Sequence, residues 1–178
     1  MEDIRKDNYL KEEYPTGIDG VTVRPVREGE ESLVLHFIRA IAAYEKMSDS
    51  VAATEEGLHK AIFEQHACNV LIVEEKGAPV GFCLYFHTFS TFCGRTNLYL
   101  EDLFLNEEVR GRGIGRAVFR ILIDIALAEG CERFEWACLN WNAPSIAFYR
   151  KMGAFPMSDW TTWRMTAKDM RDACERDG

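Results

Sequence analysis

The sequence predicts a mixed α/β domain in which several strands follow one another as hairpins. Residues 69–75 (NVLIVEE) and 80–89 (VGFCLYFHTF) are rich in β-branched and aromatic residues, as strands are. The sequence KGAP joins them and supplies the turn of a hairpin. Residues 30–46 instead place apolar side chains four residues apart, which is the period of an amphipathic helix. A chain of 178 residues fits one domain with a sizeable core.

The other elements follow from the same signals. Before the hairpin, residues 21–26 alternate as a strand, and Thr54 is suited to cap a short helix that ends near residue 63. After the hairpin we expect a strand, a helix, a strand, a helix and a last strand, over residues 97–105, 114–130, 133–139, 142–153 and 160–166. No linker or repeat interrupts this order, so residues 21–178 are predicted as one domain after a flexible extension, residues 1–20.

Local chemistry sets the ends of the two later helices. Gly130 suits the C-terminal cap of the first, and Asn142 suits the N-terminal cap of the second, with Pro144 in its first turn. The first of these helices has one apolar face, which consists of Ile114, Val118, Ile121, Leu122 and Ile125.

Composition and charge exclude several classes of function. The net charge of −8 argues against nucleic acid as a partner, since such proteins need a basic face. An acidic surface suits a cationic substrate, although it also serves solubility alone. No apolar run approaches the roughly 20 residues of a membrane span. The six cysteines form no C-x-x-C pair and the four histidines show no ligand spacing, so we predict reduced thiols, a cytoplasmic protein and no metal.

A glycine-rich turn, RGRGIG at residues 110–115, precedes the helix that starts at residue 114. It lacks the lysine of a Walker loop, and its glycine spacing and late position do not fit a dinucleotide fingerprint. The remaining pattern is R-x-x-G-x-G, in which backbone N–H groups and the helix N-terminus attract an anion such as the pyrophosphate of coenzyme A. The residues of the turn fit a phosphate site and a plain connecting turn equally well.

The chain around this turn resembles the GNAT superfamily of N-acetyltransferases, and within it the spermidine/spermine (diamine) and thialysine acetyltransferases. The resemblance covers about residues 21–170 and rests on AAYEKMSD, GRTNLYLEDLFL, VRGRGIG and LNWNAPSIAFYRKMGA. It implies a mixed, mostly antiparallel central sheet flanked by helices. It also implies acetyl-CoA as cofactor, a small cationic amine as acceptor, and a homodimer.

The resemblance also implies which residues bind the cofactor. The strand before the glycine turn would bulge and pair with the pantetheine arm through the backbone of Leu103, Phe104 and Leu105. The turn and the start of the next helix would hold the pyrophosphate. The remaining matched positions are Arg110, Gly111, Arg112, Gly113, Ile114, Gly115, Arg116, Asn142, Pro144 and Ser145.

Two residues match the catalytic groups of the family. Tyr149 matches the acid that protonates the leaving thiolate of coenzyme A, although the residues alone favour a half-buried position on a helix face. Glu101 matches the residue that takes the proton of the amine through a water molecule. In a regular strand Glu101 and Asp102 would point to opposite faces, and an edge strand with both acids in water is the alternative.

The acceptor is predicted only as a class. The resemblance implies that Tyr44, Glu45, Glu101, Asp102 and Trp136 contact the amine. One departure from the polyamine enzymes is the segment SDWTTW, where a threonine replaces the acid expected before the late tryptophan. We therefore expect acetyl transfer to a diamine, a polyamine or a lysine analogue, with peptide or protein N-acetylation and non-catalytic acyl-CoA binding as alternatives.

Overall fold

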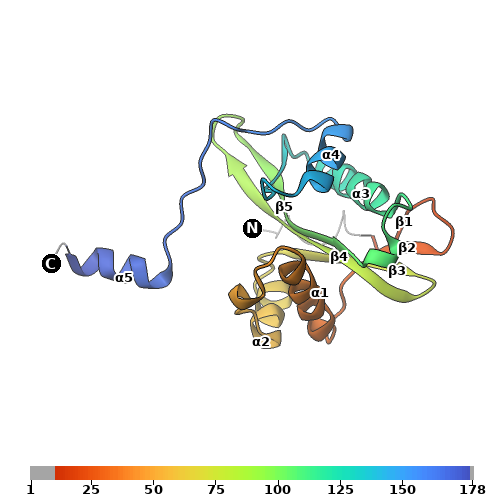
Figure 1. Cartoon of the computed structure of the whole chain (residues 1–178), viewed down its shortest axis with the longest axis horizontal. Coiled ribbons are helices and arrows are strands. Elements are labelled where there is room, and N and C mark those ends of the chain that lie inside the picture. The colour runs from red at the N-terminus through yellow and green to blue at the C-terminus, as the bar shows by residue number, and fades with distance from the viewer. Residues whose placement is uncertain (1–10, 177–178) are drawn as a thin grey trace, which may run out of the picture. The chain divides into compact units, whose positions relative to one another are not determined.

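Six strands form one sheet in the computed structural model, which describes residues 11–176 (Figure 1). Their order in space is their order in the chain, and all neighbours are antiparallel except β5 and β6, which run parallel. The predicted, mostly antiparallel sheet flanked by helices is therefore confirmed. The strands are β1 (Tyr14–Pro15), β2 (Val21–Pro25), β3 (Asn69–Glu75), β4 (Ala78–Ser90), β5 (Arg95–Leu105) and β6 (Phe134–Trp136).

The sheet belongs to the first of two compact units, residues 1–137 and 138–178. Within this unit, α1 and α2 lie on one face of the sheet and α3 lies on the other (Figure 1). The helices are α1 (Glu31–Tyr44), α2 (Glu55–His59) and α3 (Ile114–Ala128). Two single turns of 3₁₀ helix, η1 (Ser48–Ser50) and η3 (Glu107–Val109), also lie in this unit.

The helix predicted to start after Thr54 changes its winding halfway. The Thr54 hydroxyl accepts a hydrogen bond from the Gly57 N–H at 3.1 Å, which confirms the predicted cap. After α2 the chain continues as a π-helical turn, η2 (Lys60–Glu64). This wider turn carries the buried Ile62 toward the core beneath α1.

Apolar side chains fill both faces of the sheet. The face under α1 and α2 is built from Val34, Leu35, Phe37, Leu58, Ile62, Val70, Ile72, Phe82 and Leu84. On α3, all five positions of the predicted apolar face are buried. Burial of each such side chain contributes about 1.5–3 kcal/mol, so these contacts supply most of the free energy that holds α1, α2 and α3 on the sheet.

The second unit contains two helices, α4 (Ala143–Lys151) and α5 (Ala167–Arg176). The Asn142 side chain accepts a hydrogen bond from the Ser145 N–H at 3.3 Å, which confirms the predicted cap of α4. The last strand predicted over residues 160–166 is wrong, because these residues form no strand. Helix α5 was not predicted, although Thr166 and Asp169 exchange hydrogen bonds across its first turn as in a capping box.

Part of the expected N-terminal extension is ordered. Residues 14 and 15 form β1 against β2, and the Tyr14 ring is buried. Residues 1–10 lie outside the described part of the chain.

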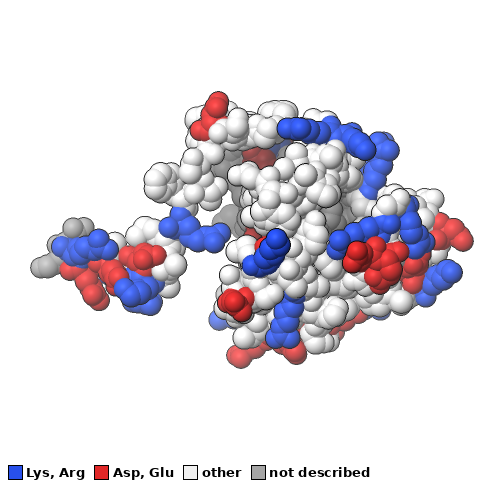
Figure 2. Space-filling view, viewed as in Figure 1, with Lys and Arg blue, Asp and Glu red and all other residues white. Residues whose placement is uncertain are grey.

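All six cysteines are free thiols, as predicted. Among residues 11–176, none of the helices combines the length and the apolar character needed to cross a membrane. Figure 2 shows acidic and basic side chains next to one another at several places on the viewed face.

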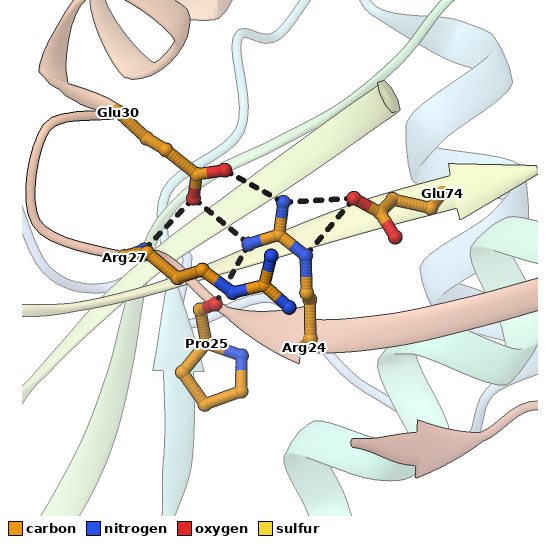
Figure 3. A network of polar contacts seen from close by, with 5 residues as sticks. All are labelled: Arg24, Pro25, Arg27, Glu30 and Glu74. Carbon is orange, nitrogen blue, oxygen red and sulfur yellow. Dashed lines mark hydrogen bonds and ion pairs between the residues drawn. The ribbon is translucent and has the colours of Figure 1, made fainter. Parts of the chain in front are cut away.

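A buried arginine fixes the chain that leads into α1 (Figure 3). Arg24, only 5% exposed, forms a bidentate pair with Glu30 and also binds Glu74 on β3. Glu30 in turn accepts a hydrogen bond from the Arg27 N–H at 2.8 Å. Arg24 lowers the pKa of Glu30, so the carboxylate stays charged. A buried charge needs such partners, and this network sets where α1 begins.

Candidate active site

A β-bulge interrupts β5 at Glu101, the predicted catalytic base. Leu84 on β4 faces Asp102, whereas the next residue, Tyr85, faces Leu100. Glu101 is therefore the extra residue of the bulge and has no partner in the ladder. The regular strand on which we based the orientation of the two acids does not exist at this point. The strand does bulge, as the resemblance implies, but the bulge lies at Glu101. The positions expected to pair with the cofactor, Leu103 to Leu105, follow it along the strand.

The bulge also marks where β5 and β6 separate. The two strands are neighbours, and they pair over three residues that end with Leu100 opposite Trp136. Beyond Leu100, no strand among the described residues pairs with this edge of β5. Its other edge continues to pair with β4 up to Leu105. On the edge away from β4, the backbone N–H and C=O groups from Glu101 to Leu105 pair with no strand of the described chain, so a ligand that binds like a strand could pair with them.

Three carboxyl groups meet beside the bulge. Glu45 directly follows α1, and it interacts electrostatically with Glu101 and with Asp102. Burial, and then Glu101 and Glu45, raise the pKa of Asp102 to about 6. Burial, and then Glu101, also raise the pKa of Glu45. Glu101 itself is exposed. Carboxylates that are crowded and partly removed from water favour a cation among them.

Tyr44 lies next to this group and contacts the start of the glycine turn. The guanidinium of Arg110 is 5.1 Å from the centroid of the Tyr44 ring and 5.3 Å from that of Phe104. Arg110 Nε also donates a hydrogen bond to the Leu105 carbonyl at 2.8 Å. Arg110 therefore links the end of β5, the end of α1 and the turn. In this arrangement its side chain holds protein groups and does not project as a free anion ligand.

The glycine turn has the geometry that an anion site requires. Gly111 and Gly113 adopt φ values of 73° and 86°, which other residues rarely adopt. Gly113 precedes α3, where Ala117 donates the first helical hydrogen bond, to the Gly113 carbonyl. The N–H groups of the first turn of α3, which begins at Ile114 and Gly115, are left to bind a ligand. The turn therefore has the geometry of an anion-binding site.

The other two arginines of the turn differ in their surroundings. Arg112 forms an ion pair with Glu75 at the end of β3, so its charge is already matched. Arg116 is exposed and makes no ion pair or hydrogen bond within residues 11–176. Arg116 is thus the arginine most available to an incoming phosphate.

The face of the sheet separates Trp136 from the acids. Paired residues share a face, so Asp102 lies with Leu84 on the α1 side, whereas Trp136 lies with Leu100 on the α3 side. The Trp136 ring packs edge-on against Phe119 of α3, with 5.0 Å between centroids. The structure therefore does not bring Trp136 together with the other predicted acceptor residues.

Sequence reasoning missed two residues on the acidic side. Tyr99 lies on the same strand as the acids, and burial, Glu101 and Glu135 raise its pKa. Glu135 faces Tyr99 across the parallel pair of strands and accepts a hydrogen bond from the Asn97 side chain at 3.3 Å. Alternation along β6 could have placed Glu135 on the face opposite Trp136. The missing signal was the register between the two strands.

The remaining predicted residues lie on α4 of the second unit. Asn142 is buried and caps the helix, with Pro144 and Ser145 in the first turn. Tyr149 lies in the second half of α4, partly buried, with its ring 5.5 Å from that of Phe148 in an edge-on arrangement. These positions agree with the local structure that the sequence predicts for a helix N-terminus followed by an amphipathic face.

Comparison with known proteins identifies the family. Residues 35–154 match the model of the Acetyltransferase (GNAT) family. The chain is 35% identical over 164 residues to thialysine N-epsilon-acetyltransferase of Sus scrofa, covering 85% of this chain and 96% of that protein. It is 34% identical over an alignment of 206 residues to L-ornithine N5-acetyltransferase of Arabidopsis thaliana, covering 89% of this chain and 90% of that protein.

A solved structure shares the fold of this chain. An integron cassette protein from the mobile metagenome of V. cholerae superposes with a TM-score of 0.72 at 25% identity, over 88% of this chain and 98% of that one. The sheet order, the split between β5 and β6 and the glycine turn at the start of α3 agree with these matches. The chain belongs to the Acetyltransferase (GNAT) family, and it is an N-acetyltransferase.

Proposed function

We propose that this protein transfers an acetyl group from acetyl-CoA to the terminal primary amine of a small cationic acceptor. The observation that carries the proposal is the group of three carboxyls, Glu45, Glu101 and Asp102, beside the bulge of β5. The names of the relatives support a lysine analogue or ornithine as the acceptor class. Diamines and polyamines carry the same kind of terminal amine and stay within the class.

The carboxyls suit the two demands that such an acceptor makes. An alkylamine has a pKa near 10.4, so at pH 7 it arrives as a cation and must lose a proton before it can attack. Asp102 and Glu45 are partly buried and would bind the ammonium group. Glu101 is exposed at the bulge, where it can accept the proton through a water molecule. Because an incoming cation favours charged carboxylates, it would lower the pKa of Asp102 from its value of about 6.

The residues around the turn fit the cofactor. When bound, acetyl-CoA supplies the thioester that the amine attacks. The N–H groups at the start of α3 would hold the pyrophosphate, with Arg116 as its cationic partner. The free edge of β5 at Leu103–Leu105 would bind the pantetheine arm through backbone groups. The Tyr149 hydroxyl would donate its proton to the departing sulfur, and Asn142, Pro144 and Ser145 would form the second cofactor contact.

The test is an acceptor panel with the full chain. We expect release of free coenzyme A thiol from acetyl-CoA with thialysine, ornithine, putrescine or spermidine, and little release with a peptide. Glu101→Gln should lower kcat at least about 100-fold, as expected when a general base is lost, while KM for acetyl-CoA stays within about twofold. Asp124→Asn, on the exposed side of α3, is the matched control and should behave like the unchanged protein.

Silence across the four amines together with turnover of the peptide would replace this proposal with peptide acetylation. Full activity of the Glu101→Gln variant would remove Glu101 as the base. A Tyr149→Phe variant with unchanged kcat would remove Tyr149 as the acid.

We further propose a homodimer in the cytoplasm. The second unit exposes several large apolar side chains, among them Phe155, Trp160 and Trp163, which a partner subunit could cover. The six free thiols suit a reducing compartment. Light scattering after size-exclusion chromatography would give twice the mass of one chain, and a monomer at micromolar concentration would contradict the proposed assembly.

A further inference from the structure

Three side chains with metal-binding atoms converge at the end of α3, on the side away from the glycine turn. His87 comes from β4, Glu129 caps α3, and Cys131 follows two residues later. Their ligand atoms all lie within 4.8 Å of one another, and His87 Nε2 is 2.7 Å from Glu129 Oε2. We propose that this cluster binds a zinc ion, with a water molecule as the fourth ligand.

The donor set favours zinc among the common metals. One imidazole nitrogen, one carboxylate oxygen and one thiolate sulfur are all ligands that zinc accepts, and three protein ligands plus water make a four-coordinate site. Calcium and magnesium prefer oxygen ligands alone, so His87 and Cys131 argue against them. The spacing of histidines and cysteines shows no ligand pattern here, and we predicted no metal from it. The ligands come from a strand and a helix end that lie about 40 residues apart in the chain, and only the fold brings them together.

The end of the helix adds an electrostatic reason for a cation. The last carbonyl groups of α3 carry the negative end of the helix dipole, which disfavours anionic side chains and favours cations. Glu129 nevertheless lies at this end, and the Cys131 N–H closes the helix by donating to the Ala126 carbonyl at 2.8 Å. Gly130, with a φ of 70°, turns the chain so that Cys131 comes back toward His87. A divalent cation would offset the charge of both side chains and of the helix end.

A buried hydroxyl points to the same place. Tyr85 on β4 is fully buried, and its hydroxyl has no hydrogen-bond partner within the described residues. The hydroxyl interacts electrostatically with Glu129 and Cys131, and the Tyr85 ring lies edge-on to His87 with 6.2 Å between centroids. A buried hydroxyl without a partner is unfavourable, because it has lost its hydrogen bonds to water. A water molecule bound to zinc would accept the hydrogen bond of this hydroxyl.

The position of the cluster separates it from the acetyl transfer chemistry. Helix α3 has 15 residues, and at 1.5 Å per residue the cluster lies about 22 Å from the glycine turn. Zinc would tie the end of α3 to β4, because His87 and the two later ligands belong to these different elements. We therefore expect zinc to stabilise the fold with no change of kcat in the acetyl transfer assay.

The test is metal titration of the full, chelator-treated chain. Zinc should raise the melting temperature, and cobalt, used as a spectroscopic substitute, should show the absorption band of a thiolate–cobalt bond at one equivalent. Cys131→Ser should abolish the band and weaken zinc binding at least about tenfold, and His87→Gln should weaken it similarly. Cys93→Ser and His66→Gln are the matched controls, because both residues lie outside the cluster.

Tyr85→Phe distinguishes a hydroxyl that supports zinc binding from one that affects only the stability of the fold. It removes an unpartnered hydroxyl, so the metal-free variant should unfold at the same or a higher temperature, yet it should bind zinc more weakly than the unchanged protein. The proposal fails if cobalt gives no thiolate band. It also fails if Cys131→Ser binds zinc as tightly as Cys93→Ser, or if zinc leaves the melting temperature unchanged.

Discussion

The charged form of Asp102 is unfavourable for the empty protein but would favour the binding of a cationic substrate. Burial is the first cause of its raised pKa, and the two neighbouring glutamates add to it. A carboxylate in this position is unfavourable for the empty protein, and no cationic side chain is paired with it within residues 11–176. A ligand with a positive charge would supply what the fold leaves out. This is the residue-scale reason for expecting a cationic acceptor.

The raised pKa of Asp102 predicts a specific dependence of stability on pH. Between its ordinary value of 3.8 and about 6, the folded protein binds this proton and the unfolded chain does not, so the free energy of unfolding falls as pH rises through this window. Asp102→Asn should remove that fall. The variant should match the unchanged protein near pH 4 and exceed it above pH 6, by at most about 3 kcal/mol.

Urea denaturation at intervals from pH 4 to pH 7 measures this difference. Asp124→Asn serves as the control, since its side chain is exposed and should leave the shape of the curve unchanged. If the difference in free energy of unfolding between Asp102→Asn and the unchanged protein is the same at every pH, then burial does not raise the pKa of Asp102.

Individual residues were predictable where the chemistry is local. Thr54, Gly130 and Asn142 were assigned to helix ends correctly because a cap depends on its own turn of chain. Trp136 was grouped with the acids by the resemblance, and the sequence shows neither the bulge at Glu101 nor the register of β6, which place it on the other face. One extra residue in a strand changes which side chains share a face. The acceptor residues depend on that non-local fact.

At the scale of elements, the sequence predicted helices and inner strands better than edges. Helix α3 has its predicted face because its period of 3.6 is read along one segment. A strand needs a partner, and the alternation of residues 160–166 could not show whether one exists. The short β1 has only two residues and is defined by pairing with β2, so its own sequence carries little signal.

Two glycines beside Leu105 separate folding from cofactor binding. A Cβ on Gly81 would lie 2.4 Å from the Phe104 carbonyl oxygen and 2.6 Å from Leu105 Cδ2, so Gly81→Ala should lower the free energy of unfolding by about 1–3 kcal/mol. A Cβ on Gly115 would meet Leu105 Cδ1 at an ordinary 3.5 Å, so Gly115→Ala should keep or raise stability by up to about 1 kcal/mol.

The same pair tests the cofactor proposal. Because Gly115 belongs to the first turn of α3, Gly115→Ala should raise KM for acetyl-CoA several-fold while the fold stays intact. Denaturant unfolding and steady-state kinetics on both variants measure the two effects. A Gly81→Ala variant as stable as the unchanged protein would show that the strands move apart to accept a Cβ at this position. An unchanged KM in Gly115→Ala would place the pyrophosphate elsewhere.

At the scale of the whole molecule, the family match extends over both compact units. Residues 35–154 include strands β3 to β6 and helix α4, so the matched segment continues past the boundary at residue 137. The prediction of a single acetyltransferase domain over residues 21–178 remains a proposal.

The net charge of −8 belongs to this scale as well, since a field of that sign acts on a charged substrate before any contact forms.

That charge predicts a salt dependence of the reaction. With ornithine, putrescine or spermidine as acceptor, kcat/KM should fall as ionic strength rises from about 0.01 M to about 0.3 M, because screening shortens the Debye length from about 30 Å to less than 8 Å. The fall should be steeper for spermidine, which carries more positive charge than ornithine. It should be shallower in Asp102→Asn, whose site has lost one carboxylate. Initial rates at low acceptor concentration and saturating acetyl-CoA measure the slopes. A kcat/KM that stays flat for every amine would show that acceptors are captured by short-range contacts alone. The acidic composition would then serve solubility alone, the interpretation that the net charge by itself favours.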